Sequence, residues 1–309
     1  MRNVIDCAGV ERLFKKLRGQ TDSIHGAFFL ITQSILLPKF LILALAVLIS
    51  GCTTTSVFQQ APFKIPSARY ASIVVNANSG KVLHEIRPDA IRFPASLTKM
   101  MTMYMMFEAL QRGRITKSTQ IPISAYAAGR PASKLWLKAG SSISVDTALN
   151  ALAVKSANDV ATAVAEYFSG SEAAFARAMT SKARSLGMAS TTFRNASGLP
   201  DRRQVTTARD MAKLGIILRK RFPQYFSYFE KRSFSFRGKT IRGHNKVLGQ
   251  LRGANGIKTG YTRASGFNLV TSARTSQGLV VGVILGENSG ASRNRHMVQL
   301  INRYGHRRR

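Results

Sequence analysis

Ser96 and Lys99 are the residues whose types and spacing most clearly fit catalysis. They lie in Pro94-Ala-Ser-Leu-Thr-Lys99, where a Met- and Leu-rich pattern predicts the start of a helix. Residues three positions apart share a helical face, so the serine hydroxyl and the lysine amine can approach each other. A serine becomes a strong nucleophile when a base takes its proton, and a lysine made neutral by burial or nearby positive charge is such a base. Taken alone, this spacing also fits a helix N-cap followed by an exposed lysine.

Two further motifs follow in order along the chain. Ser156-Ala-Asn158 falls in an Ala-rich region that predicts helix, and Lys258-Thr-Gly260 falls on a predicted late strand. Taken singly, Ser156 and Asn158 also fit helix caps, and Lys258 fits an ordinary charge on an edge strand. The complete series, Ser-x-x-Lys, Ser-x-Asn and Lys-Thr-Gly, is found in penicillin-binding proteins and class A β-lactamases.

The elements that must position these motifs follow from the hydrophobic pattern. An early hairpin, a central helical block and late Val- and Ile-rich strands predict one sheet whose strands come from both ends of the chain. The helical block then forms a separate lobe, and a site is expected at the junction. The predicted hairpin covers 70–86, the helices cover 96–112, 147–168, 172–186, 207–221 and 292–304, and the late strands cover 233–237, 256–259, 265–274 and 278–286.

From about Ala68 to the C-terminus, the chain closely resembles the serine D-alanyl-D-alanine carboxypeptidases of peptidase family S11, the low-molecular-mass penicillin-binding proteins. The resemblance implies an α+β fold of the β-lactamase and penicillin-binding-protein type, with an antiparallel sheet flanked by helices plus a helical lobe. It also implies a hydrolase that removes the terminal D-alanine from peptidoglycan stem pentapeptides without a cofactor, and that β-lactams acylate. The supporting segments outside the three motifs are Leu135–Gly140, Asn195–Asp201, Thr206–Met211 and Gly260–Leu269.

The resemblance assigns roles to the first two motifs by position. Ser96 corresponds to the acylated nucleophile and Lys99 to its general base. Ser156 would relay a proton to the departing D-alanine. Asn158 would hold the lysine and the substrate amide.

The resemblance places substrate-binding residues late in the chain. Lys258, Thr259 and Gly260 belong to the strand that faces the substrate, and the first two would face its terminal carboxylate. Arg293, near the start of the last predicted helix, corresponds to the distal carboxylate anchor, a task that suits the two donors of a guanidinium. The oxyanion hole would use backbone N–H groups of the nucleophile and of Tyr261. Many relatives have His at this last position, a difference that bears on the deacylation rate.

A class A β-lactamase is the first alternative, because it shares all three motifs. Such enzymes use a Glu between Ser-x-Asn and Lys-Thr-Gly to activate the deacylating water. This chain offers Glu166 and Glu172 close behind the second motif and then none until Glu230. We therefore expect long-lived acylation by penicillin instead of rapid drug hydrolysis.

A DD-endopeptidase that cuts D-alanyl cross-links is the second alternative, and the motifs do not separate it from a carboxypeptidase. The short stretch after Gly260 predicts no additional C-terminal β domain, a feature that fits some endopeptidases and short carboxypeptidases. A third alternative is an inactive wall-binding module. The intact nucleophile and base set argues against this module, since binding alone does not require it.

The charge of the chain restricts its partners. It has 46 Lys and Arg against 14 Asp and Glu, a net charge of +32, yet its 45% hydrophobic residues indicate a folded protein. Such a charge fits nucleic acid, an anionic membrane or wall surface, or an acidic substrate. Two Cys and five His without metal-type spacing indicate neither a zinc site nor a disulfide framework.

An export signal decides among those partners. The apolar run Phe40–Ile49 follows Lys39 and precedes Ser-Gly-Cys52, which is typical of a signal segment ending in a lipobox. We expect an N-terminal signal or anchor segment over 1–51, a tether over 52–67 and the catalytic domain over 68–309. The protein is then exported to the periplasm and held by a lipidated Cys52 or an N-terminal anchor. This location argues against nucleic acid and favours an anionic membrane or wall; cleavage at an ordinary signal site nearby remains an alternative.

Overall fold

The computed structural model describes residue 65 and residues 67–306. These residues belong to one unit, Phe63–Arg309. The predicted segment 1–51, the lipobox cysteine Cys52 and nearly all of the predicted tether lie outside the described residues. No helix in the described part of the chain is long and apolar enough to cross a membrane.

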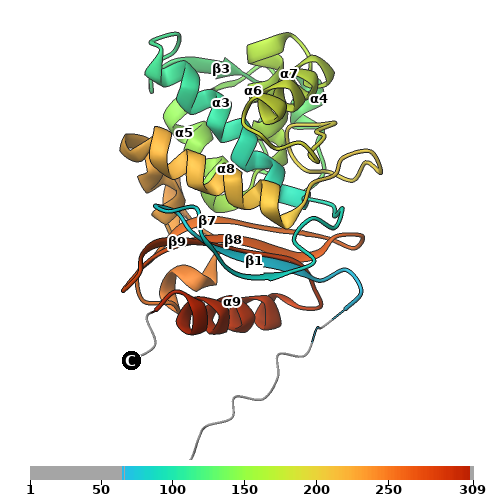
Figure 1. Ribbon diagram of the computed structural model, residues 1–309. Coiled ribbons are helices and arrows are strands. Elements are labelled where there is room, and N and C mark those ends of the chain that lie inside the picture. The colour runs from blue at the N-terminus through green and yellow to red at the C-terminus, as the bar shows by residue number, and fades with distance from the viewer. Residues whose placement is uncertain (1–64, 66, 307–309) are drawn as a thin grey trace, which may run out of the picture. The chain divides into compact units, whose positions relative to one another are not determined.

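A five-stranded antiparallel sheet combines early and late strands in the order β2-β1-β9-β8-β7 (Figure 1). This arrangement confirms the predicted α+β fold and the predicted meeting of strands from both ends. The late β9 lies between β1 and β8, so the early hairpin closes onto the C-terminal strands. The strands are β1 (Ala71–Asn76), β2 (Val82–Ile86), β7 (Ala254–Thr262), β8 (Gly266–Thr275) and β9 (Gly278–Glu287).

Helices cover both faces of this sheet, with α8 (Ala208–Arg221) on one face and α9 (Gly290–Tyr304) on the other (Figure 1). Successive residues of a strand point to opposite faces, so Ile73 joins the core shared with α8 and Val74 joins the core shared with α9. Each fully buried side chain of this kind contributes about 1.5–3 kcal/mol. Burial on both faces explains why the strands are apolar at successive positions instead of alternating.

The helix-to-sheet contact is close where a strand carries glycine. A Cβ built on Gly282 of β9 would lie 2.7 Å from the sulfur of Met297 in α9. A larger residue would therefore force the side chains of Met297 and Ile301 to move.

The helical lobe packs around α3, whose Met-rich sequence fills its core. Met100, Met101, Met103 and Met106 are fully buried, so these side chains serve packing. Phe107 contacts four aromatic rings from the segment after α8. The lobe contains α3 (Lys99–Gln111), α4 (Ala125–Ala128), α5 (Val145–Asn150), α6 (Asn158–Ser169) and α7 (Glu172–Ser185).

The predicted single helix over 147–168 is wrong, because the chain breaks between α5 and α6. A π-helical turn, η2 (Ala151–Lys155), ends at Ser156, whose φ of +61° is left-handed. This conformation costs a non-glycine residue about 1–2 kcal/mol. The Ala-rich composition favours helix throughout, so no local signal predicted the break that separates the two polar residues of the second motif.

Smaller elements also differ from the predictions. The strand expected at 233–237 does not join the main sheet but forms a hairpin of β5 (Ser233–Phe236) with β6 (Lys239–Arg242). A second two-stranded sheet pairs β3 with β4. The remaining bounds are β3 (Gln120–Pro122), β4 (Ser142–Ser144), and the 3-10 turns η1 (Ala95–Thr98), η3 (Pro223–Glu230) and η4 (Lys246–Gly249).

Candidate active site

The Ser-x-x-Lys motif spans the junction of η1 and α3. The Nζ atom of Lys99 lies 3.3 Å from the Oγ atom of Ser96, so the predicted approach of hydroxyl and amine is present. The same amine donates to Asn158 Oδ1 at 2.8 Å and to the backbone oxygen of Ser197. One lysine thus joins the nucleophile, the second motif and the loop at 195–204.

Lys99 is fully buried, and its surroundings act on its protonation. Burial lowers the pKa of this lysine well below its ordinary value, and the charge of Lys258 lowers it further. The carboxylates of Glu172 and Asp159 act in the opposite direction. The net effect favours the neutral amine over the ammonium, and a neutral amine is the form that can accept a proton.

The second motif places two polar groups beside this amine. The Ser156 hydroxyl is buried and has no hydrogen-bond partner within the described residues. Asn158 begins α6; its Oδ1 accepts from Lys99 and its Nδ2 donates to the backbone oxygen of Pro131 at 3.0 Å. The amide orientation is therefore fixed from both ends, and the serine hydroxyl is available to a substrate.

A strap over 131–137 is attached to the same helix start. The Asp159 carboxylate accepts from the backbone N–H groups of Leu135 and Leu137, and the Asn158 N–H donates to Ser133 O at 2.7 Å. These bonds hold the strap against the site and bring Ser133 to its wall.

The Lys-Thr-Gly motif lies on β7 beside the nucleophile. Lys258 and Thr259 are 2% and 7% exposed, so the lysine is not the solvated edge charge that its strand position also allowed. Burial lowers the pKa of Lys258 to about 7, and the charge of Arg293 contributes. A Cβ on Gly260 would lie 3.0 Å from the Ser96 backbone nitrogen, which explains glycine at this position.

The residue after this motif is exposed at the rim. Tyr261 is 55% exposed and its ring stacks on Phe267 with ring centroids 4.2 Å apart. Its backbone belongs to β7, so its N–H comes from the same strand as the motif. The side chain is free to contact a bound molecule.

Arg293 lies in the first turn of α9 and is 6% exposed. Its guanidinium donates to Asn294 Oδ1 at 2.8 Å and to Asn268 O at 3.4 Å. Burial lowers the pKa of Arg293 to about 10. The side chain of Asn268 donates to the backbone oxygens of Phe93 and Pro94, which ties β8 to the segment before the nucleophile.

A cavity of about 560 Å³ brings the three motifs and the arginine together. Lys99 and Lys258 lie beneath this surface, where they act on it through charge and hydrogen bonds. Sequence reasoning did not identify His244, Ser133, Leu199 and Phe267 as lining residues. The first three belong to irregular segments and Phe267 to the start of β8, where neither spacing nor periodicity distinguishes them. The predicted site residues on the wall are Ser96, Ser156, Asn158, Thr259, Gly260, Tyr261 and Arg293.

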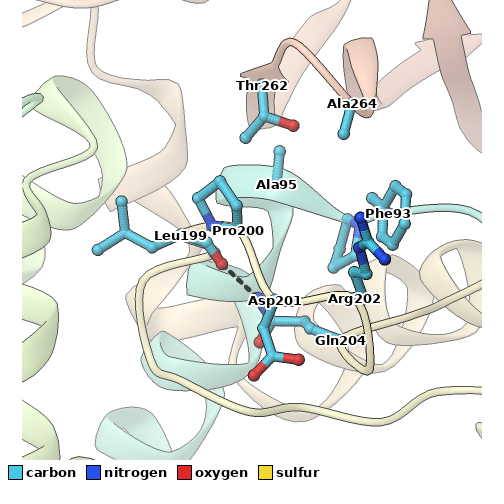
Figure 2. A pocket seen from close by; sticks show the side chains of 11 residues that line it. Phe93, Ala95, Leu199, Pro200, Asp201, Arg202, Gln204, Thr262 and Ala264 are labelled. Atoms are coloured by element: carbon cyan, nitrogen blue, oxygen red, sulfur yellow. Dashed lines mark hydrogen bonds between the residues drawn. The ribbon is translucent and has the colours of Figure 1, made fainter.

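A smaller pocket of about 140 Å³ adjoins this cavity on the side of the 195–204 loop (Figure 2). Leu199, Pro200 and Thr262 line both hollows. Apolar side chains make up much of its wall, and Gln204 fixes the loop by donating to Leu199 O at 3.2 Å. Its apolar character contrasts with the cationic end at Arg293.

The two glutamates that follow the second motif, which the β-lactamase alternative would need in the cavity, form hydrogen bonds away from it. Glu166 accepts from Ser124 at 2.7 Å, and Glu172 accepts from Thr162 at 3.2 Å and from the Ala196 N–H at 3.1 Å. Neither is among the residues that line the cavity. Within the described chain, no three His, Cys, Asp or Glu residues are grouped so that they could hold a metal ion.

Comparison with known proteins agrees with this geometry. The family model described as D-alanyl-D-alanine carboxypeptidase, peptidase family S11, matches residues 56–289. The chain belongs to this family. It is 34% identical over 236 residues to D-alanyl-D-alanine carboxypeptidase DacA of Escherichia coli K12, covering 74% of this chain and 59% of the relative. DacF of Bacillus subtilis is 30% identical over 235 residues, covering 75% of this chain and 60% of the relative.

Solved structures of penicillin-binding proteins share this fold. Penicillin-binding protein 5 from Haemophilus influenzae has a TM-score of 0.72 at 31% identity, covering 77% of this chain and 71% of that one. Penicillin-binding protein D2 from Listeria monocytogenes, solved in an ampicillin-bound form, has a TM-score of 0.67 at 26% identity. The match covers 76% of this chain and 96% of that one. The chain spans about 59–60% of the length of the two curated relatives named above.

Proposed function

We propose that the chain is a serine D-alanyl-D-alanine carboxypeptidase that removes the terminal D-alanine from peptidoglycan stem pentapeptides. The main support is the buried amine of Lys99, which has a lowered pKa and lies 3.3 Å from the hydroxyl of Ser96. An inactive wall-binding module has no need of this arrangement. The family membership supports the same reaction class.

In the proposed acylation, Ser96 Oγ attacks the carbonyl carbon between the last two D-alanines while Lys99 takes its proton. The oxyanion lies at the backbone N–H groups of Ser96 and Tyr261. The C–N bond then breaks, and the Ser156 hydroxyl passes a proton to the leaving amine. Water hydrolyses the ester and returns the serine, so the products are free D-alanine and the shortened stem.

The cationic end of the cavity supports recognition of a terminal carboxylate. Lys258 and Arg293 supply positive charge, and Thr259 supplies a hydroxyl on the wall. Charged hydrogen bonds of this kind contribute more than neutral ones and position the scissile bond. A β-lactam presents a carboxylate and a reactive carbonyl together, so we expect it to acylate the same serine.

The first experiment is covalent labelling of the full-length chain by fluorescent penicillin, beside release of D-alanine from a stem pentapeptide. We expect the wild type to label and to release D-alanine, and Ser96→Ala to do neither. Equal labelling of the variant would contradict the proposal. No Glu is among the described residues that line the cavity, which predicts an acyl-enzyme that persists. Rapid drug turnover would instead favour the β-lactamase alternative.

We further infer export to the cell envelope, with Cys52 as the lipidated first residue. The support is the apolar run Phe40–Ile49 followed by Ser-Gly-Cys. Mass spectrometry of the mature N-terminus should find an acylated Cys52, and an unmodified start elsewhere would exclude it. From Cys52 on, the chain keeps 40 Lys and Arg against 11 Asp and Glu, and this net charge of +29 supports attraction to an anionic membrane or wall, which added salt should weaken.

A further inference from the structure

The guanidinium of Arg293 is held in place by neutral oxygens. Its Nε and Nη2 atoms donate to Oδ1 of Asn294 at 3.1 and 2.8 Å, and its Nη1 atom donates to the backbone oxygen of Asn268 at 3.4 Å. A guanidinium is planar and has five N–H donors. These bonds fix its plane and use three of the five, so two remain for a ligand in the cavity that Arg293 lines.

The turn of α9 that carries Arg293 is itself fixed to the end of the sheet. Glu287, the last residue of β9, is fully buried, and its carboxylate accepts from the Ser292 hydroxyl at 2.9 Å. The same carboxylate contacts a ring nitrogen of His296, one turn further along the helix. These contacts set the backbone position of Arg293. The direction of its side chain is then set mainly by the amide of Asn294.

Asn268 links this arginine to the segment before the nucleophile. Besides accepting from Arg293, it donates through its side chain to the backbone oxygens of Phe93 and Pro94 at 2.9 and 3.1 Å. Pro94 precedes Ser96 by two residues. The guanidinium is therefore oriented relative to the reacting hydroxyl. A substrate with a fixed length between its scissile carbonyl and its carboxylate requires such an arrangement.

The neutral charge of Asn294 matters as much as its position. This side chain is 5% exposed, and a carboxylate at such a buried place would form an ion pair with Arg293 and offset its positive charge. An amide oxygen holds the same two donors without adding charge. No Asp or Glu is among the described residues that line the active-site cavity. The charge of Arg293 reaches as far as Lys258, whose pKa it lowers.

We propose that Asn294 is a positioning residue, whose amide oxygen orients the guanidinium of Arg293 toward the terminal carboxylate of the substrate and leaves its positive charge available to that carboxylate. This inference rests on the proposed function. Asn294 is not among the residues that line the active-site cavity, so it acts through the arginine. A carboxylate anchor is used equally before and during bond cleavage. Weakening it should therefore raise KM and leave kcat nearly unchanged.

The first test measures the kinetics of two variants of the full-length chain with a stem pentapeptide. Asn294→Asp keeps an oxygen acceptor but adds a negative charge beside the guanidinium. We expect KM to rise about tenfold and kcat to stay within about twofold of the wild type. Asn294→Leu removes the acceptor without adding charge, and we expect a smaller rise in KM of about threefold.

The second test asks whether the effect depends on a carboxylate in the ligand. The rate constant for acylation by benzylpenicillin should fall about tenfold in Asn294→Asp, because this drug carries a carboxylate. Acylation by the methyl ester of benzylpenicillin, whose carboxylate is masked, should stay within about twofold of the wild type. The ester reaction also reports that the variant is folded.

The matched control is Asn302→Asp, which makes the same substitution at an exposed position near the other end of α9. It adds the same charge to the same helix, far along the chain from the arginine. We expect it to leave KM, kcat and both acylation rates unchanged.

Three results would overturn the inference. KM could stay unchanged in Asn294→Asp, or this variant could lose equal rate with benzylpenicillin and with its methyl ester, which would make Asn294 a structural residue only. An effect of the same size in Asn302→Asp would assign the loss to the net charge of α9. Failure of the proposed function is distinct, because the wild type would then neither label with penicillin nor release D-alanine.

Discussion

Two buried lysines, Lys99 and Lys258, occupy one site but have different surroundings. Lys99 is held by the hydroxyl of Ser96, by the Asn158 amide oxygen and by a backbone oxygen. Lys258 donates to the backbone oxygen of Thr259 at 3.1 Å and lies near the charge of a buried arginine. The first environment positions an amine against a hydroxyl, and the second concentrates positive charge. In the proposed mechanism, the same residue type thus serves as base in one place and as electrostatic support in the other.

The difference also couples the two residues. Burial is the largest cause of the lowered pKa in each lysine, but the charge of Lys258 further lowers the pKa of Lys99. In the proposed mechanism, Lys258 therefore acts on the reaction twice, once through the substrate carboxylate and once through the pKa of Lys99. Variants at the two positions should separate these effects.

Replacement of the proposed base should have the largest effect. Lys99→Met removes the proton acceptor for Ser96 while retaining a buried side chain of similar length. General-base catalysis contributes about 10²–10⁴-fold, so we expect the rate of acylation by penicillin to fall by about a thousandfold. Stopped-flow labelling measures this rate. Acylation within tenfold of the wild type would assign the base to another group.

Replacement of the electrostatic lysine should cost less and change the pH profile. In Lys258→Met, loss of a buried charge partner of the carboxylate should lower kcat/KM for the pentapeptide by at least about thirtyfold, or about 2 kcal/mol. The pKa of Lys99 should rise because a neighbouring positive charge is gone. Since the neutral amine is the active form, the ascending limb of the kcat/KM profile should move to higher pH. An unshifted limb would show that the two lysines are not coupled.

The same variant should reveal what the buried charge costs in stability. The pKa of Lys258 is about 7 in the folded chain and 10.5 in its ordinary state, so the unfolded chain binds more protons between these values. Stability of the wild type should therefore rise across this window by up to about 1.4 kcal/mol per pH unit from this group. The destabilisation is fully present below pH 7, and it disappears above 10.5.

Urea unfolding of the wild type and Lys258→Met at several pH values across that window measures the effect. The stability advantage of the variant should be largest near pH 7 and shrink as the pH approaches 10.5. An advantage that is independent of pH would mean that packing, and not charge, distinguishes the two proteins.

A change at Gly260 should have the smallest effect and tests geometry without altering charge. In Gly260→Ala, the new Cβ would lie 3.0 Å from the backbone nitrogen of Ser96, so the nucleophile must shift by a few tenths of an ångström. We expect about tenfold slower acylation, since small misplacements of reacting groups are costly. The ascending limb of the pH profile should keep its position, because both lysines remain.

The sequence predicted which residues meet at this site better than it predicted their surroundings. The three motifs identified Ser96, Lys99, Ser156, Asn158 and the Lys-Thr-Gly strand, and the structure brings them together around one cavity. Their spacing carries this information because each motif occupies one short element. Hydrophobic periodicity likewise predicted the main strands that the structure contains.

Features that depend on contacts distant in sequence were not predicted. The break at Ser156 lies in an Ala-rich stretch that favours helix, and bonds from the 131–137 strap to Lys155 O and to the Asp159 carboxylate hold the chain on both sides of it. Burial of Lys258 depends on how β7 packs beside η1, and His244 reaches the cavity from an irregular segment without a motif. The predicted lipidation at Cys52 lies outside the described residues and stays a prediction.

The central claim is that a buried, neutral Lys99 activates Ser96, and the pH dependence of acylation tests it most directly. The second-order rate constant for benzylpenicillin should be measured by stopped flow on the full-length chain across the stable pH range. The account predicts a rise in rate controlled by a pKa well below the ordinary lysine value of 10.5. A rate that rises only near that ordinary value would contradict it.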